Sequence, residues 1–272
     1  MDWTFVALLL AVGAAVGFAA GLLGIGGGML LVPALTMILT AQQVPLDHVV
    51  HVAVATSLAT ILFTSVSSVR AHHRKGAVLW PVVKSFAPGI LVGSLVGAQI
   101  AGRLPTAWLA LGFAVFVGFS ATQMLLDRKP KPQRELPKPA GMFGVGSLIG
   151  LLSSFVGAGG GFISVPFMVW CNVRIQNAVA TSAALGFPIA AAGTVGYIIS
   201  GLNASGLPKG SIGFIYVPAL VSIAATSVLT APLGARVAHA LDTKPLKRIF
   251  ALMLYALAAY MLYKALRAFG MA

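Results

Sequence analysis

The chain has 272 residues, of which 58% are hydrophobic and only 8% are charged. A soluble domain usually carries about 25% charged residues, so this chain cannot cover a water-facing surface of its own size. The net charge of +13 could suit nucleic acid in a soluble protein, but in so apolar a chain basic residues instead mark cytoplasmic loops. Composition therefore excludes a soluble domain and indicates no nucleic-acid partner.

The apolar residues fall into continuous runs, most of them long enough to cross a bilayer. A transmembrane helix needs about 20 apolar residues, and continuous rather than alternating runs favour helices over a β-barrel. In the first half the runs are 3–23, 29–39, 49–69, 82–100 and 107–126. In the second half the runs are 142–156, 162–171, 178–199, 212–235 and 249–266. We predict an all-α polytopic membrane protein with about eight long transmembrane helices and two short segments.

A polar segment divides these runs into two groups. Residues 127–139 read DRKPKPQRELPKP, and such charges and prolines cannot lie in lipid. We therefore expect a first transmembrane repeat over residues 1–127, a cytoplasmic linker over 128–140 and a second repeat over 141–272. The first run lacks a basic start, so we expect it to be a span and not a cleaved signal peptide.

The two groups share three motifs in the same order. They are GLLGIGGGMLLVP at 21–33 with GLLSSFVGAGGGFISVP at 150–166, AVATS at 53–57 and 178–182, and GAQIAGRLPT at 97–106 with GARVAHALDT at 234–243. Internal repeats are common in transporters, in which the substrate site lies where the repeats meet near the middle of the membrane. A duplicated membrane scaffold without transport is the alternative.

Basic residues are distributed differently in the two repeats. In the first repeat they cluster in an expected loop at 70–75 and in the linker, both of which should be cytoplasmic, whereas in the second repeat they cluster at 236–248. Under the positive-inside rule this reversal indicates inverted repeats. Inversion requires an odd number of crossings in each repeat, so the short runs 29–39 and 162–171 would each have to count as a crossing.

Two glycine clusters interrupt the hydrophobic runs, and a proline follows each of them. The candidate binding residues here are Gly26, Gly27, Gly28 and Pro33, with Gly159, Gly160, Gly161 and Pro166. Glycine lets a helix break, and a break within the membrane is tolerated where it is buried or lines a cavity. The N-terminus of the next helix would attract an anion. Close helix packing through small residues is the alternative.

Matched hydroxyl pairs are the second group of candidates. Thr56 and Ser57 in the first repeat correspond to Thr181 and Ser182 in the second. Hydroxyls can donate hydrogen bonds to an oxyanion without the cost of a buried charge. They can instead bond to carbonyls of their own helix.

Four further residues are secondary candidates. Lys84 could attract anions at a vestibule, although a lysine near a span end usually reaches to the interface. Gln176 and Asn177 could add amide donors beside the second hydroxyl pair. His51 could sense protons; it lies one helical turn from His48, but no third ligand for a metal is evident.

The acidic residues are as informative as the basic ones. All five lie at the ends of apolar runs or in the linker. Proton-driven cation carriers usually place a carboxylate within the membrane, so an anionic substrate fits this chain better. Cys171 is the only cysteine, which leaves no disulfide and no cysteine cluster. We expect no metal, no cofactor and no enzymatic activity, because no catalytic spacing occurs in the spans.

GLLGIGGGMLLVPAL, the AVATS pair and GAGGGFISVPFM resemble the sulfite exporter TauE/SafE family, a group of probable membrane transporter proteins. The resemblance covers nearly the whole chain, and the linker is least alike. It implies a multi-pass protein of the bacterial inner membrane that exports sulfite, organosulfonates or related small anions. The residues that match the family motif are Gly26 to Gly28, Pro33, Thr56, Ser57, Gly159 to Gly161, Pro166, Thr181 and Ser182.

We therefore expect alternating access around a site between the two glycine clusters, with a small anion and the lipid bilayer as partners. A channel for the same anions, a carrier for a non-sulfur solute and a membrane scaffold are the remaining alternatives. The sequence carries no signal for an oligomeric state.

Overall fold

A computed structural model of the chain describes residues 3–23, 27–126, 134–238 and 243–271. Ten helices account for most of these residues. They are α1 (Trp3–Leu23), α2 (Gly28–Ala41), α3 (Leu46–Arg74), α4 (Trp80–Ala101), α5 (Thr106–Leu126), α6 (Pro139–Val156), α7 (Gly161–Trp170), α8 (Ile175–Gly201), α9 (Val217–Ala238) and α10 (Thr243–Ala268). Two short strands, β1 (Ser211–Ile212) and β2 (Ile215–Tyr216), pair antiparallel before α9.

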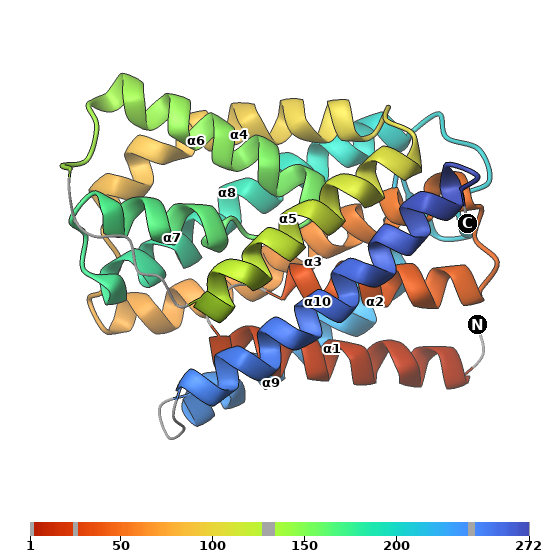
Figure 1. Cartoon of the computed structure of the whole chain (residues 1–272), viewed down its shortest axis with the longest axis horizontal. Helices are drawn as coiled ribbons and strands as arrows, with labels where there is room; N and C mark the ends of the chain where they lie inside the picture. Colours follow the sequence, from red (N-terminus) through yellow and green to blue (C-terminus); the bar gives the residue numbers. More distant parts are fainter. Residues whose placement is uncertain (1–2, 24–26, 127–133, 239–242, 272) are drawn as a thin grey trace.

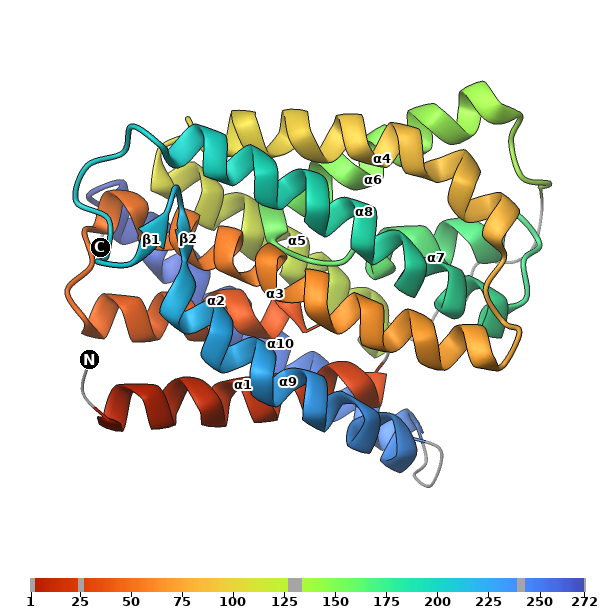
Figure 2. The same ribbon diagram turned by 180° about the vertical axis from the view of Figure 1, so that it is seen from behind.

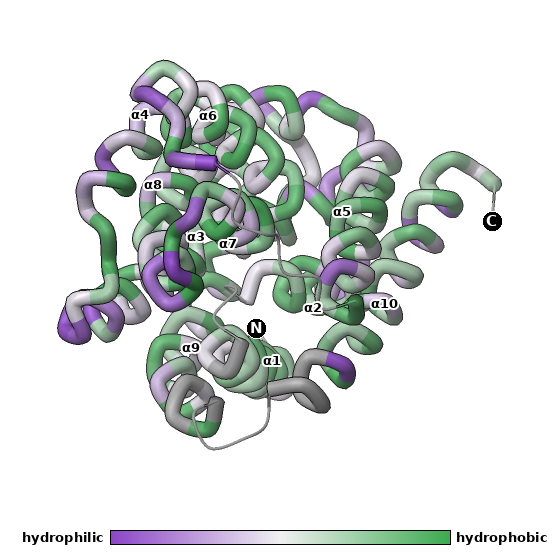
Figure 3. The backbone as a smooth tube through the Cα atoms, turned by 60° about the vertical axis from the view of Figure 1, so that its left-hand side comes forward, coloured by the Kyte–Doolittle hydropathy of each residue, from purple (hydrophilic) through white to green (hydrophobic). Residues whose placement is uncertain are grey.

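Eight of the described helices are long and apolar enough to cross a membrane, and α2 and α7 are the two shorter apolar helices. The predicted all-α membrane fold is therefore confirmed, including its two short segments. The structure shows most of the hydrophilic residues in loops and at helix ends, while the helix middles are largely hydrophobic (Figure 3).

Two details of the sequence-based prediction are wrong. The basic cluster at 70–75 was expected in a loop, but α3 continues to Arg74, because arginine favours helix and its long side chain reaches water from a helix end. The run 212–235 was expected to be one apolar stretch, but its first residues form the β1–β2 hairpin, which turns at Gly213 with a φ of 54°. That positive φ suits glycine.

Helices from the two halves of the chain pack against each other throughout the molecule. α3 and α8 pack together in the interior, and residues 49–61 of α3 are all buried. Around them α1 packs along α9, α4 along α6, and α5 along α10 (Figures 1 and 2). Each of these pairs joins one helix that precedes residue 127 to one that follows it, so the two halves share one hydrophobic core.

Small residues let two of these pairs approach closely. A Cβ on Gly17 of α1 would overlap the Ser227 backbone of α9, and one on Gly93 of α4 would overlap the Ser147 carbonyl oxygen of α6. Helices that associate in lipid commonly use such glycines, because no hydrophobic effect drives them together there.

The path of the chain is consistent with the inverted repeat predicted from the charges. α1 begins and α10 ends at one end of the molecule, whereas α5 ends and α6 begins toward the other (Figure 1). α2 and α7 each reverse the direction of the preceding helix, as the odd number of crossings requires.

Candidate functional site

The two glycine clusters meet in the interior. A Cβ on Gly28, at the start of α2, would overlap the carbonyl oxygen of Gly157, so the two backbones are in direct contact. Gly157 and Gly160 have φ values of 66° and 75°, a left-handed conformation that glycine adopts without strain. The breaks of the two halves are thus brought together. Gly26 lies outside the described residues.

The two serines of the AVATS motifs attach their helices to these breaks. Ser57 Oγ donates a hydrogen bond to the Gly157 carbonyl oxygen at 2.9 Å, from the first half of the chain to the second. Ser182 Oγ lies 2.7 Å from Ser164 Oγ, which also donates to the Gly160 carbonyl oxygen of the same half. Both serines are buried.

The two threonines of the same motifs make equivalent contacts across the molecule. Thr56 Oγ1 accepts a hydrogen bond at 3.0 Å from the backbone N–H of Tyr216, which immediately precedes α9. Thr181 Oγ1 accepts one at 3.1 Å from the backbone N–H of Leu79, which immediately precedes α4. Each threonine therefore holds the start of a helix from the other half, and both hydroxyls are fully buried.

A cavity of about 180 Å³ lies between the α1–α9 pair and the α3–α8 pair. Ligand pockets for drug-sized molecules measure about 300–1,000 Å³, so this volume suits a small solute. Gly159 and Gly161 of the second glycine cluster line it, together with five hydroxyl side chains. These are Thr64, Ser65, Ser67 and Ser68 of α3, and Ser182 of α8.

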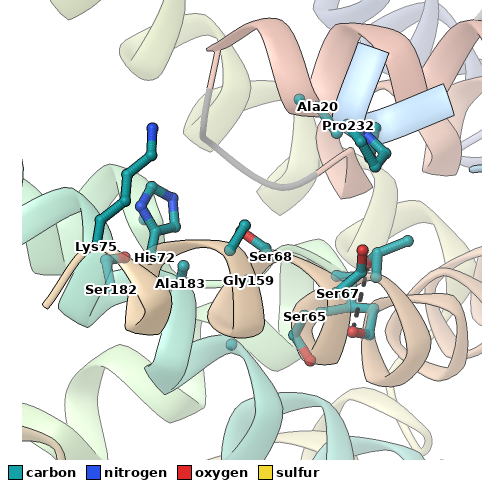
Figure 4. A pocket seen from close by; sticks show the side chains of 17 residues that line it. Ala20, Ser65, Ser67, Ser68, His72, Lys75, Gly159, Ser182, Ala183 and Pro232 are labelled. Carbon is teal, nitrogen blue, oxygen red and sulfur yellow. Dashed lines mark hydrogen bonds between the residues drawn. The ribbon is translucent and has the colours of Figure 1, made fainter. Parts of the chain in front are cut away.

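Basic side chains mark one end of the cavity. His72, in the last turns of α3, and Lys75, just after it, line the cavity, and no carboxylate does so among the described residues. Figure 4 shows Lys75 and His72 side by side near Ser182, with Ala20 and Pro232 across the space. Hydroxyl donors together with a cation and without a competing acid suit a small anion.

Most of the cavity hydroxyls were missed from the sequence, although a signal for them exists. Thr56, Thr60, Thr64 and Ser68 recur every four residues, which places them along one face of α3. Thr60 Oγ1 donates to the Thr56 carbonyl oxygen at 2.9 Å, so these two residues lie one turn apart on the same face of α3. The AVATS motif contains Thr56, at the start of this row of hydroxyls. The cavity lies at the other end of the row, at Thr64 and Ser68.

The remaining predicted residues lie away from the cavity. Pro33 is buried within α2, and Gly27 precedes it, whereas Pro166, Lys84 and Gln176 are exposed and do not line the cavity. The Asn177 side-chain amide donates to the Ala77 carbonyl oxygen at 2.9 Å, which holds the loop before α4.

His51 of α3 is buried against the connection between α4 and α5. Its Nε2 donates to the carbonyl oxygens of Ala101 and Leu104 at 3.1 and 2.9 Å, and its Nδ1 lies 3.3 Å from Thr106 Oγ1. These bonds fix the connection between α4 and α5. Within the described part of the chain, no group of three or more His, Cys, Asp or Glu side chains could hold a metal.

Comparison with known proteins agrees with the resemblance carried by the sequence motifs. A family model described as Sulfite exporter TauE/SafE matches residues 9–261. A "Probable membrane transporter protein" of Haemophilus influenzae is 38% identical over 263 residues, which cover 96% of this chain and 100% of that protein. The "Probable membrane transporter protein YunE" of Bacillus subtilis is 26% identical over 279 residues, 95% of this chain and 98% of that one. No solved structure matches the chain.

Proposed function

We propose that this chain, which belongs to the sulfite exporter TauE/SafE family, carries a small sulfur-containing oxyanion across the bacterial inner membrane. It is a multi-pass membrane protein of a transporter family, similar over nearly its whole length to proteins named as probable membrane transporters. The observation that carries the choice of an anion is the cavity, which five hydroxyls, His72 and Lys75 line and which no acid of the described residues lines. A carrier of this kind needs no catalytic residues and no cofactor, and we assign none to this chain.

The cavity supports a carrier that works by alternating access. On α3 its lining begins at Ile61 and continues to the C-terminal end of the helix, and on α8 it extends only as far as Gly186. The cavity therefore serves one end of the molecule, whereas a channel would need a path to both. The C-terminal end of α3, which carries Arg70 and Arg74, and the start of α6 after the linker both lie toward that end (Figure 1). Under the positive-inside rule we therefore take that end to be cytoplasmic.

A cavity that opens to the cytoplasm would load the anion from inside the cell, as an exporter requires. We propose that the two halves are inverted repeats and that rocking between them exposes the anion to each side in turn. Ser182 links the site to α7 through Ser164, so its hydroxyl is well placed to hold the substrate and to follow movement of the glycine break.

Flux in proteoliposomes tests this proposal. Proteoliposomes that contain the purified protein should take up ³⁵S-sulfite saturably, and unlabelled sulfite on the opposite side of the membrane should stimulate the uptake. The variant Ser182→Ala should lower the flux about fivefold, the worth of one hydrogen bond of about 1 kcal/mol. A panel of sulfate, thiosulfate, an alkylsulfonate, acetate and an amino acid defines the substrate class.

Each alternative predicts a different flux. A channel would show flux that neither saturates nor responds to sulfite on the opposite side. A carrier of a non-sulfur solute would move acetate or the amino acid but not sulfite. A scaffold would move none of the panel. Any of these results would refute the proposed function.

A further inference from the structure

A groove lies on the outer surface of the molecule, between α3, α4 and α8. It has a volume of about 570 Å³, and none of the described residues lines both this groove and the cavity proposed for the anion. α3 and α4 both pack along α8 and not along each other (Figure 2). Val66 of α3, Trp80 of α4 and Phe187 of α8 line the groove with exposed side chains. In a membrane the groove therefore opens to lipid.

The lining of the groove changes from polar to apolar along its length. On α3 it consists of Val66, Val69, Arg70 and His73, whose spacing of three and four residues places them on one face of the helix. At 1.5 Å per residue, Val66 lies about 10 Å from His73 along α3. Apart from Arg70, His73 and Trp80, every residue that lines the groove is apolar. The groove thus has a polar end, where α3 ends and α4 begins, and an apolar course away from it.

The polar end lies at the depth of the lipid headgroups. α3 has 29 residues, a length of about 44 Å at 1.5 Å per residue. The hydrocarbon core of a bilayer is only about 30 Å thick, and the headgroup regions bring the total to about 40–45 Å. The last turns of α3, with Arg70 and His73, therefore leave the hydrocarbon. Trp80 is the first residue of α4, and tryptophan is enriched at this interface.

Two donors at the polar end suit a phosphate group. Trp80 Nε1–H donates to His73 Nδ1 at 3.2 Å, and the two rings meet edge to face with centroids 5.6 Å apart. Nδ1 accepts such a bond in the neutral ring that carries its proton on Nε2, so His73 Nε2–H is a donor. The Arg70 guanidinium is always charged and can bind phosphate through two N–H groups. No acid of the described residues lines the groove to compete with a phosphate.

We propose that the groove binds one anionic phospholipid of the cytoplasmic leaflet. Arg70 and His73 hold its phosphate, and an acyl chain lies along Val83 of α4 and Ala184 of α8, which are buried at the bottom of the groove. Charge complementarity carries this choice of occupant, because basic pockets between helices on the cytoplasmic side are typical sites for anionic headgroups. The site goes beyond the proposed function, since it lies apart from the cavity.

Quenching of tryptophan fluorescence by brominated acyl chains tests the site. The chain has four tryptophans, so replacing Trp3, Trp108 and Trp170 by phenylalanine leaves Trp80 as a reporter within the groove. In vesicles that mix brominated phosphatidylglycerol with unbrominated phosphatidylcholine, quenching of Trp80 should show about a fivefold preference for phosphatidylglycerol. Arg70→Gln in the same background should abolish this preference.

Two matched controls accompany this experiment. Arg74→Gln removes the same charge one turn further along α3, where the exposed side chain does not line the groove, and should leave the preference intact. Val115→Trp, as the only tryptophan, reports on an exposed position near the middle of α5 and should show no preference. Equal preferences at Trp80 and at position 115, or equal effects of Arg70→Gln and Arg74→Gln, would overturn the lipid site.

A second measurement needs no change of tryptophans. In native mass spectrometry from a neutral detergent, the wild-type chain should retain one phosphatidylglycerol at a concentration at which phosphatidylcholine is lost. Ala87→Phe fills the groove and should weaken retention about tenfold. Leu91→Phe, one turn further along α4 and outside the groove, should not. Equal retention of both lipids, or a dimer of the chain without lipid, would refute the site. Neither measurement uses sulfite flux, so failure of the proposed function would be recognised separately.

Discussion

Replacing Lys75 by glutamine removes a positive charge from the rim of the cavity and keeps a side chain of similar length. Lys75 lines the cavity next to His72, and no acid among the described residues lies there to compensate its charge. If the cavity binds an anion, this substitution should weaken binding. The folded structure should tolerate it, because the side chain is exposed.

The exposure of Lys75 also sets the size of the effect. Two unit charges about 4 Å apart attract by about 1 kcal/mol in water and by about 4 kcal/mol at an effective dielectric constant of ~20. For an exposed side chain the value near that of water applies. The loss of about 1 kcal/mol raises the KM for sulfite about fivefold. Lys75→Glu reverses the charge and should raise KM about thirtyfold, from about 2 kcal/mol.

Flux in proteoliposomes as a function of sulfite concentration measures KM and the maximal rate separately. We expect KM to rise, and the difference between variant and wild type to shrink in ~1 M salt, where the screening length falls to about 3 Å. Lys84→Gln is the matched control, because Lys84 is exposed one turn into α4 and does not line the cavity. An unchanged KM in Lys75→Glu, or equal effects of the Lys75 and Lys84 substitutions, would refute the electrostatic role of the rim.

Three further predictions concern the fold around the site. Gly28→Leu should abolish the folded protein in size-exclusion chromatography, because its side chain would overlap the Gly157 backbone. Thr56→Val should lower thermal stability by about 1–3 kcal/mol, since it leaves the Tyr216 N–H buried without an acceptor. Burial raises the pKa of the Cys171 thiol, so less thiolate is present at pH 7, and maleimide should modify it more slowly than a free thiol, with the rate rising through alkaline pH.

Each of these predictions has a control within the chain or in solution. Gly112→Leu should be harmless, because nothing lies within 4 Å of a Cβ added there. Thr60→Val should cost less than Thr56→Val, since the Thr60 hydroxyl bonds only to its own helix. Glutathione measures the rate of a free thiol. Equal stability of both threonine variants, normal folding of Gly28→Leu, or glutathione-like labelling of Cys171 would contradict the corresponding prediction.

Much of the fold could be predicted from the sequence because the bilayer imposes simple requirements. The apolar run 29–39 became α2 (Gly28–Ala41) and 162–171 became α7 (Gly161–Trp170), within a few residues. Length and hydropathy are enough to find such helices. They do not report where a helix leaves the apolar region, so the basic end of α3 was expected in a loop.

The candidate site was predicted less completely, because a repeat motif reports that two positions are equivalent and not what they face. Thr56 and Thr181 occur in matched motifs, and both use their hydroxyls to hold a backbone N–H from the other half. Ser182 alone of the four matched hydroxyl residues lines the cavity. Ser67 and Lys75 line the cavity where α3 packs beside α9, and that packing depends on residues far apart in the sequence.

The central claim, that the anion passes through the cavity beside Ser68, is tested most directly by filling it. Ser68→Trp places an indole among the cavity hydroxyls, whereas Phe63→Trp places the same group on the outer surface of the same helix, at a position 51% exposed. ³⁵S-sulfite flux should be abolished in Ser68→Trp and retained in Phe63→Trp, with both proteins folded. Wild-type flux through Ser68→Trp would contradict the account.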